Sequence, residues 1–438
     1  MAKRVILRNG TLIDGSGAPA ARNDALVIEG NRIKSVGPLP PDIRLEEETV
    51  IDASGQWILP GLIDAHVHLS YGYPAVRGEG RGRGNTRPEF NTLRAARSAQ
   101  RVLHSGVTGI CVPGGTWFTD VAVRDAVRLG LMEGPRIHCA GRMLITYGCI
   151  EDDEPSWVGT PDHSVGVLCD SRDALVNEVR RQNKHGVNFI KMADSRSGES
   201  QMLAQEDIAA VAAEAHRRNL RVAIHSRGAG STRAAAEAGV DWIIHADLAT
   251  ESDLEAVAKR GIPIAPTATF LATVIEEGDR LGPEQVQLDI NRMKRHFDNL
   301  VTLMQRAKEL GIKLLCGTDS GNNPFMPFGE KHAKEAEILV RYGGWSPMEA
   351  ICAMTKGNAF ALALEGEVGE VKAGKLADVI VLKRDPLADI TVLQGGRHLA
   401  CVIKDGKLVD LGEGDLSFGR AASERPRSAA PLNMISSP

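Results

Sequence analysis

The fold is decided by nine residues in which an apolar run ends in two histidines, PGLIDAHVH at positions 60–68. In a β-strand, side chains two positions apart point to the same side, so His66 and His68 can face a common metal ion. A His-x-His pair alone is weak evidence, because two histidines often have this spacing without a metal. The rest of the chain has to supply further ligands.

Four more residues of the metal-binding kind also close apolar runs. Lys191 follows 187–190, His225 follows 221–224, His245 follows 242–244 and Asp319 follows 314–318. Barrel enzymes carry their chemistry at the C-terminal ends of the strands, so these runs would deliver all six side chains to one face. The alternative, unrelated polar residues that each cap a core strand, requires five coincidences. We therefore predict a metal site made of His66, His68, Lys191, His225, His245 and Asp319.

The middle of the chain alternates strand-like apolar runs with amphipathic segments of helical length, about eight times, which predicts parallel β/α units. Strands are expected to end near His68, Pro113, Leu144, Ala193, His225, His245, Thr269 and Asp319. The helices between them include residues 89–104, 172–185, 206–219 and 286–310. The predicted fold class is α/β, with a (β/α)8 TIM barrel.

Both ends of the chain consist of short strands separated by turns, which predicts a small β-sandwich domain formed by the two termini together. We expect residues 1–58 and 365–412 to form this sandwich and residues 59–364 to form the barrel. The Ser-, Ala- and Pro-rich residues 413–438 are expected to be a flexible tail. The Gly- and Arg-rich segment 71–88 is either a solvated loop or a lid over the site.

Lys191 needs a special role, because a protonated amine cannot bind a metal. It could form a salt bridge or contact the substrate, or it could react with carbon dioxide to give an anionic carbamate that bridges two divalent ions. We favour N6-carboxylated Lys191 and two ions about 3.5–4 Å apart. Imidazole and carboxylate ligands suit zinc, which we take as the expected metal, with manganese, cobalt or iron as alternatives.

These ligands predict metal-assisted hydrolysis, in which a metal-bound hydroxide attacks a carbonyl carbon. Asp319 is the expected general base, which takes the proton of the water and later passes it to the leaving amine.

Composition points to a cytoplasmic protein with a small-molecule substrate. The 52 basic and 56 acidic residues leave a formal net charge of −4, which gives no electrostatic reason to expect nucleic acid or an anionic membrane. The seven cysteines are scattered and lack a C-x-x-C pair, as is typical of reduced thiols in the cytosol. We see no signal peptide and no membrane-spanning run, and we expect a homo-oligomer.

Taken together, the chain resembles the amidohydrolase superfamily from about Val5 to Asp410. The resemblance is carried by residues 9–17, 60–68, 317–320 and 369–382, which occur in the order that the family shows. It implies a (β/α)8 barrel beside a β-sandwich. Within the superfamily, the chain is most similar to the branch of Xaa-Pro dipeptidase-like, imidazolonepropionase-related and ochratoxin-hydrolysing enzymes. That branch implies one metal on His66, His68 and Asp319, a second on His225 and His245, and carboxylated Lys191 as the bridge.

The resemblance also narrows the reaction. Related deaminases carry a glutamate three residues after the fifth-strand histidine, where this chain has Gly228, so deamination is disfavoured. Peptidase-like relatives show Thr-Gly-Gly-His after the third strand, whereas this chain ends the corresponding stretch in Cys149, which leaves the nature of the bond open. We predict hydrolysis of an amide-type C–N bond of a small molecule. The alternatives are a carbamate, a urea or another non-peptide bond, or a catalytically silent scaffold, which would be expected to have lost ligands.

Four residues are candidates for contacts with the substrate. His138, in the third strand, could orient a carbonyl or pack inside the barrel. Tyr147 could donate a hydrogen bond to a tetrahedral intermediate, and Arg227 could pair with a substrate carboxylate. Cys149 stands where relatives place a histidine that contacts the substrate. Each also has a plain interpretation as a core, loop or surface residue.

Overall fold

The structure is a computed structural model that describes residues 4–71, 87–152, 155–159, 163–196, 198, 200–281, 289–321 and 325–412. Almost all of the predicted Gly- and Arg-rich loop or lid, residues 72–86, lies outside the described residues, as does the predicted tail 413–438.

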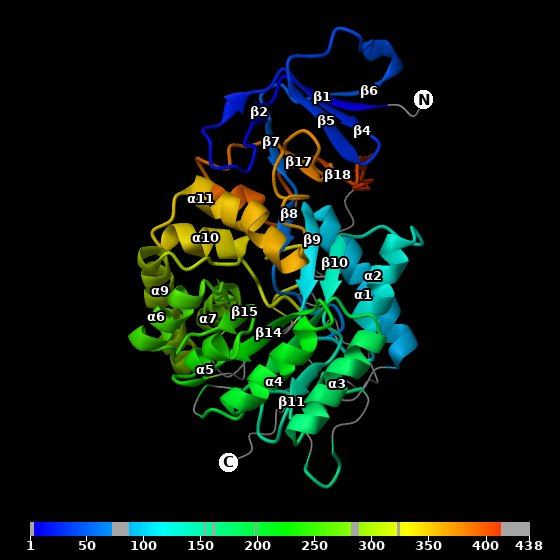
Figure 1. Cartoon of the computed structure of the whole chain (residues 1–438). Helices are drawn as coiled ribbons and strands as arrows, with labels where there is room; N and C mark the ends of the chain where they lie inside the picture. Colours follow the sequence, from blue (N-terminus) through cyan, green and yellow to red (C-terminus); the bar gives the residue numbers. More distant parts are fainter. Residues whose placement is uncertain are drawn as a thin grey trace.

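Two β-sheets at one end of the molecule contain strands from both ends of the chain (Figure 1). The antiparallel pairing of β7 with β17 joins the two ends directly. Leu7, Ile58, Val379 and Ile403 are buried in one apolar cluster within this unit. The first sheet has the order β5 (Arg32–Gly37), β4 (Ala25–Glu29), β1 (Val5–Arg8) and β6 (Thr49–Asp52). The second has the order β19 (Lys407–Leu408), β18 (Leu399–Lys404), β17 (Val379–Leu382), β7 (Trp57–Pro60), β2 (Thr11–Leu12) and β3 (Ala21–Arg22).

Parallel strands form the second part of the structure, and most of them are completely buried, as expected when both faces of a sheet are covered. One sheet has the order β10 (Arg136–Cys139), β9 (Val107–Val112) and β8 (Leu62–Asp64). The other has the order β12 (Gly166–Leu168), β11 (Met143–Ile145), β13 (Phe189–Ala193), β14 (Arg221–Ser226), β15 (Trp242–His245) and β16 (Ile264–Ala265).

Helices lie around these strands (Figure 1). Several have clear end signals: Thr250 and Asp253 form a capping box at the start of α6, and Gly261, with a φ of 65°, ends that helix. The α-helices are α1 (Pro88–His104), α2 (Thr119–Arg128), α3 (Arg172–Lys184), α4 (Gln205–His216), α5 (Ser231–Ala238), α6 (Glu251–Arg260), α7 (Ala268–Leu281), α9 (Ile290–Leu310), α10 (Lys334–Arg341) and α11 (Pro347–Cys352). Short helical segments cover Leu45–Glu47, Ala353–Gly357, Asn358–Leu362 and Ile390–Leu393. In the described part of the chain, no helix is long and apolar enough to cross a bilayer.

Backbone hydrogen bonds connect the two parallel sheets into a barrel-like arrangement. Asn188 N donates to Cys139 O at 2.8 Å, next to the start of β13. On the other side, Leu315 N donates to Ile264 O at 2.8 Å and Ala65 N donates to Cys316 O at 2.9 Å. The segment expected to be the eighth strand makes isolated bridges, Ile264 with Leu314 and Val67 with Ser320, instead of a regular strand. The fold is therefore an α/β, TIM-barrel-like fold with an extra β domain.

The prediction that the seventh strand ends near Thr269 is wrong. β16 ends at Ala265, and helix α7 already begins at Ala268. Pro266 cannot donate a ladder hydrogen bond, and the backbone N–H groups of Ala268 and Thr269 donate instead to the buried carboxylate of Glu335. A carboxylate at a helix N-terminus is favourable, so a tertiary contact replaces the end of the strand by the start of a helix.

Arg136 connects the barrel-like part to the β domain. Its Nε donates to Asp378 Oδ2 at 2.7 Å and its Nη2 donates to Asp378 Oδ1 at 3.1 Å, and it also forms an ion pair with Asp405. Although burial lowers the pKa of the Arg136 guanidinium, the charges of these two carboxylates raise it further, so it stays charged. One cation therefore compensates two half-buried or buried anions across the interface.

We expect Arg136→Met to lower the free energy of unfolding by about 3 kcal/mol, because two carboxylates would be left close together without their cation. Urea unfolding at neutral pH measures this loss. Arg172→Met is the matched control: Arg172 pairs with Asp207 at 2.8 Å on the surface, and its loss should cost at most about 1 kcal/mol. Equal losses in the two variants would contradict the structural role of Arg136.

Candidate metal centre

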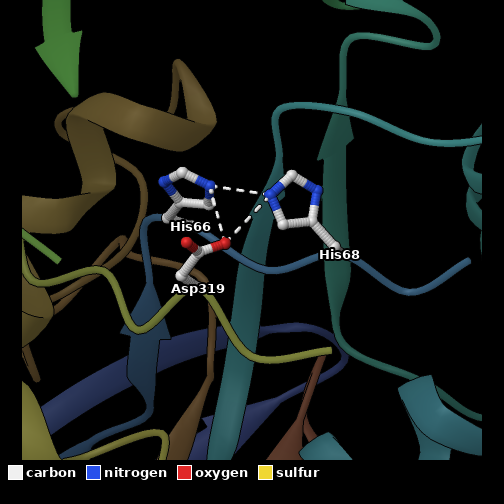
Figure 2. A group of neighbouring side chains, drawn as sticks. All are labelled: His66, His68 and Asp319. Atoms are coloured by element: carbon white, nitrogen blue, oxygen red, sulfur yellow. Dashed lines mark hydrogen bonds and ion pairs between the residues drawn. The ribbon is translucent and has the colours of Figure 1, made fainter. Parts of the chain in front are cut away.

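Three of the predicted ligands converge on one point (Figure 2). His66 and His68 follow β8. Asp319 precedes Ser320, which forms an isolated β-bridge with Val67, the residue between the two histidines. His66 Nε2 and His68 Nε2 lie 2.8 Å apart, and Asp319 Oδ1 lies 3.4 Å from the first and 3.2 Å from the second. All three side chains are buried, and their ligand atoms lie within 4.8 Å of one another.

The hydrogen bonds of His68 show which of its nitrogens is available. His68 Nδ1 lies 2.8 Å from Gly114 O, and a carbonyl oxygen only accepts, so Nδ1 carries the proton. The Nε2 lone pair of His68 then points at His66 Nε2 and at the Asp319 carboxylate. Two imidazole nitrogens and a carboxylate oxygen directed at one point are the donor set of a divalent cation such as zinc. These residues therefore fit the metal that the sequence predicts.

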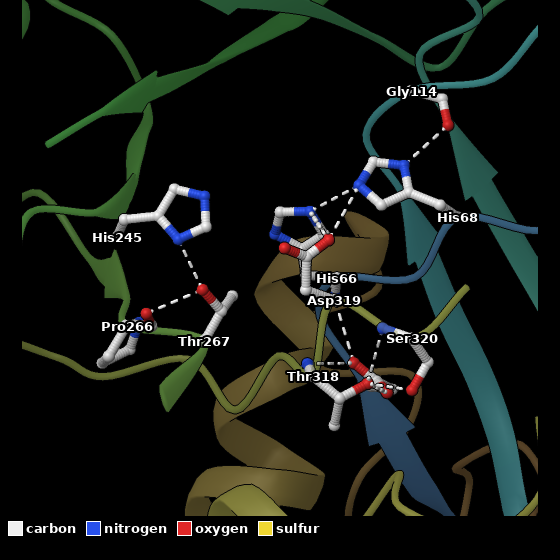
Figure 3. A network of polar contacts seen from close by, with 10 residues as sticks. His66, His68, Gly114, His245, Pro266, Thr267, Thr318, Asp319 and Ser320 are labelled. Atoms are coloured by element: carbon white, nitrogen blue, oxygen red, sulfur yellow. Dashed lines mark hydrogen bonds and ion pairs between the residues drawn. The ribbon is translucent and has the colours of Figure 1, made fainter. Parts of the chain in front are cut away.

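His225 and His245 form a second pair beside the first. Their ring centroids lie 4.6 Å apart, and the His245 ring lies 5.8 Å from that of His66. His225 Nε2 lies 3.1 Å from Ser195 O and donates to it, which leaves Nδ1 with the lone pair. His245 Nδ1 lies 2.6 Å from Thr267 Oγ1 (Figure 3). Because the Thr267 hydroxyl can donate to Pro266 O at 2.7 Å, His245 Nδ1 is the donor to Thr267 and Nε2 keeps the lone pair.

Burial keeps the histidines in the neutral form that a metal requires. It lowers the pKa of His66, His225 and His245 well below the ordinary value, and the nearby charge of Arg227 contributes to the lowering. Protonated imidazoles at this place would repel a cation and offer it no lone pair. His66, His225 and His245 therefore each keep a lone pair at neutral pH.

Lys191 lies within β13 and is only 1% exposed. Burial lowers its pKa to about 7, although the charge of Asp319 acts in the opposite direction. The Lys191 charge also contributes to the lowered pKa values of His66, His225 and His245, which places the amine beside the histidines. All six predicted ligands thus lie in the same buried region.

The backbone at this site is strained. His245, Ala246, Thr267 and Asp319 have φ values of 76°, 59°, 54° and 59°, in the left-handed region that residues other than glycine rarely adopt. Such residues cost about 1 kcal/mol or more each and persist only where surrounding contacts hold them. Two of these four residues, His245 and Asp319, are predicted ligands.

The predicted substrate contacts fall in different places. Arg227 lies one residue beyond β14 and close to the histidines, where its charge helps to lower the pKa of His225 and of His245. Cys149 is buried and bridges to Ser195, whose carbonyl holds His225, and burial raises the pKa of its thiol to about 12. Tyr147 is 47% exposed in the loop after β11. His138 stacks on Phe189 at a centroid distance of 5.5 Å, near the start of β13, and this geometry favours packing in the barrel.

Sequence reasoning missed residues that support the ligands, among them Asp64 and Thr267. Asp64 is completely buried; its Oδ1 accepts from His66 N at 3.0 Å and from Thr318 N at 3.1 Å. Its spacing of two from His66 and four from His68 was a signal, because all three share one face of the strand. Thr267, which holds His245, had no such signal.

Comparison with known proteins identifies the family. A model of the amidohydrolase family matches residues 57–409, and the chain belongs to this family. Ochratoxinase of Aspergillus niger is 27% identical over 93% of this chain and 87% of its own length. Imidazolonepropionase of Rubrobacter xylanophilus is 26% identical over 89% of this chain and 91% of its own length. A solved Xaa-Pro dipeptidase with methionine bound in its active site is 28% identical, with a TM-score of 0.79 over 93% of this chain and 100% of that one. These relatives confirm the branch that the sequence motifs indicated.

We expect His68→Ala to weaken the binding of Zn²⁺ by at least about 100-fold, because it removes a nitrogen that points at the convergence of three donors. Metal content after equilibration with limiting Zn²⁺ measures the change. His216→Ala is the control, since His216 pairs with Asp241 at 2.9 Å on the surface of α4 and should leave binding unchanged. Equal metal content in both variants would argue against this site.

Proposed function

We propose that this protein is a metal-dependent amidohydrolase that cleaves an amide-type C–N bond of a small, carboxylate-bearing molecule. In this proposal His66, His68 and Asp319 bind one divalent ion, His225 and His245 bind a second, and N6-carboxylated Lys191 bridges them. Zinc is the expected metal for these ligands. The names of the relatives, an ochratoxinase, an imidazolonepropionase and a Xaa-Pro dipeptidase, support hydrolysis in general and leave the substrate to be determined.

The observation that carries the proposal is the convergence of His66 Nε2, His68 Nε2 and Asp319 Oδ1. These three side chains are buried, and their ligand atoms lie within 4.8 Å of one another. A silent scaffold has no need for buried imidazoles directed at a carboxylate, because apolar residues would fill this volume at lower cost.

The residues of the chain provide the proton transfers and the orientation. When bound, the divalent ions would polarise the scissile carbonyl and make water acidic enough to attack it near neutral pH. The Asp319 carboxylate accepts the proton of the attacking water and passes it to the nitrogen of the departing amine as the C–N bond breaks. Thr267 and Gly114 keep His245 and His68 in the tautomers that leave Nε2 unprotonated.

Carboxylation of Lys191 is supported by its place and its chemistry. The side chain is buried among five other candidate ligands, where an ammonium would be both desolvated and repelled by any bound cation. With a pKa of about 7, much of the amine is neutral at neutral pH, and the neutral amine is the form that reacts with carbon dioxide. The carbamate would turn the one cation of the set into an anionic oxygen ligand.

Arg227 is the proposed group that recognises the carboxylate of the substrate. Its Nη1 donates to Asp247 Oδ2 at 2.5 Å, and the Asp247 carboxylate also pairs with His296. Because Asp247 is buried and fixed, it holds the planar guanidinium in one orientation beside the histidines. A guanidinium held in this way can form charge-assisted hydrogen bonds to a second carboxylate.

A hydrolysis screen of the Zn²⁺-loaded protein tests the proposal. The panel should contain N-acyl amino acids, dipeptides, carbamates and aryl ureas, each with and without a free carboxylate. We expect turnover of acylated amino acids or dipeptides, and its loss on chelation and in Asp319→Asn. Turnover limited to ureas or carbamates would contradict the proposed amide-type bond. No turnover in any Zn²⁺-loaded preparation would contradict the enzyme function.

For Lys191, we expect bicarbonate to increase metal uptake by the metal-free wild type and to have no effect on Lys191→Ala, which lacks the amine. The neutral fraction of a group with a pKa of about 7 rises from about one-tenth at pH 6 to about nine-tenths at pH 8. The bicarbonate-dependent part of metal uptake should therefore increase across this range, far below the range of an ordinary lysine. Two metals per chain and full activity in Lys191→Ala would contradict the bridge.

For Arg227, we expect Arg227→Met to raise KM for a carboxylate-bearing substrate by about 30-fold, since a charged hydrogen bond contributes about 2 kcal/mol. The same substrate with its carboxylate converted to an amide should show little change. Arg233→Met is the control, because Arg233, which is partly exposed, pairs with Asp253 in the first turn of α6. An equal loss for the acid and the amide would rule out recognition of the carboxylate by Arg227.

A further inference from the structure

Residues 332–335, around the start of α10, contain three ionisable side chains that are buried in the interior. His332 is 2% exposed, Lys334 is 6% exposed and Glu335 is fully buried. Burial of three ionisable groups so close together in sequence is unusual, because each loses its hydration. Each of the three has a specific partner, and two of these partners lead to proposed metal ligands.

The Glu335 carboxylate holds the chain that follows Thr267. Its Oε1 accepts from Ala268 N at 3.0 Å, and its Oε2 accepts from Thr269 N at 2.8 Å and from Thr269 Oγ1 at 2.6 Å. These N–H groups belong to the first turn of α7, directly after Thr267. These contacts therefore hold the backbone directly after Thr267. Thr267 has a φ of 54°, and its hydroxyl accepts a hydrogen bond from His245 Nδ1.

His332 supports the other half of the site through Asp64. His332 Nδ1 donates to Asp64 Oδ2 at 2.8 Å, and the same oxygen accepts from Thr318 Oγ1 at 2.5 Å. The second oxygen of Asp64 binds the backbone N–H groups of His66 and Thr318. Asp64 thus holds the backbone of His66 and that of Thr318, the residue before Asp319, and His332 in turn holds Asp64. Figure 3 shows the Thr318–Ser320 segment below His66 and Asp319.

The third side chain leads to no ligand. Lys334 Nζ donates to Glu276 Oε1 at 2.7 Å, in the body of α7. This ion pair connects residues 332–335 to α7. Among the described residues, no hydrogen bond leads from Glu276 to the histidines. The ion pair provides an internal control for the other two contacts.

We infer that His332 and Glu335 are positioning residues of the metal centre, His332 for His66 and Asp319 and Glu335 for His245. The inference rests on the proposed function, since it assumes that these side chains bind metal. The strain of the site supports a role beyond packing: Thr267 and Asp319 have left-handed backbones that would relax without opposing contacts. An apolar face on α10 would attach the helix at lower cost, because burying a carboxylate that has to accept three hydrogen bonds is expensive.

The test compares four variants in the full chain, and a fifth serves as a rescue. Glu335→Gln turns one acceptor into a donor that faces N–H groups, Thr267→Val removes the last link to His245, and His332→Leu removes the donor to Asp64. Glu276→Gln breaks only the ion pair with Lys334. Dissociation constants for Zn²⁺, measured by competition with a chromophoric chelator, and anomalous-scattering occupancies at limiting Zn²⁺ are the readouts.

We expect the first three variants to weaken Zn²⁺ binding by about 10–100-fold, as is usual when a group that orients a ligand is lost, and Glu276→Gln to bind like the wild type. Glu335→Gln and Thr267→Val should lower the occupancy beside His225 and His245, and His332→Leu should lower that beside His66 and His68. His332→Asn, whose amide can still donate to Asp64, should restore binding. If Glu335→Gln does not fold, Thr267→Val alone decides the Glu335 pathway.

The possible failures are distinguishable. A wild-type chain that binds no Zn²⁺ would overturn the proposed function and this inference with it. A wild type that binds Zn²⁺, with His332→Leu and Thr267→Val equal to Glu276→Gln, would leave the proposed function intact and overturn the inference. A purely structural role would lower the melting temperature of all four variants without a selective loss at one metal position.

Discussion

The buried carboxylate of Asp64 is the constraint on which the site depends. It accepts hydrogen bonds from groups 254 and 268 residues away in the chain, Thr318 and His332, and from the backbone of His66. A carboxylate without solvent needs nearly all of its acceptor positions filled, so the first and last segments of the barrel-like part have to meet around it. The side chains of His66, His68 and Asp319 then face one another as a consequence.

Hydrogen bonds outside the ligand set choose which nitrogen of each imidazole faces the centre. Gly114 O and Thr267 Oγ1 occupy Nδ1 of His68 and His245, whereas Ser195 O occupies Nε2 of His225. The opposite choice in His225 follows from its partner, the carbonyl of Ser195, which lies just beyond the end of the neighbouring strand β13. Contacts of this kind fix tautomer and ring direction before a metal binds, which lowers the entropy that binding has to overcome.

The sequence predicted what depends on local pattern. The prediction that His66, His68, Lys191, His225, His245 and Asp319 share one face rests on the apolar run that precedes each of them, and the family branch followed from the same motifs. The seventh strand was misplaced because β16 has only two residues and Glu335, 66 positions away from Thr269, starts a helix there. No local pattern announces such a contact. The same limit explains why Thr267 and Glu335 were missed.

The centre and the choice of substrate are separate physical problems in this molecule. The ligands are held by backbone carbonyls, a threonine and buried carboxylates, none of which needs to change for a different substrate. Arg227, Cys149 and Tyr147 instead lie just beyond the ends of strands or in the loops that follow them, and of the three only Tyr147 is exposed. A loop residue as exposed as Tyr147 can vary without disturbing the strained backbone of His245 and Asp319. Arg227 differs from the other two because Asp247, which itself pairs with His296, holds its guanidinium, so Arg227 adds a directed positive charge beside the histidines. In the proposed function, this charge is the group that would recognise a carboxylate on the substrate.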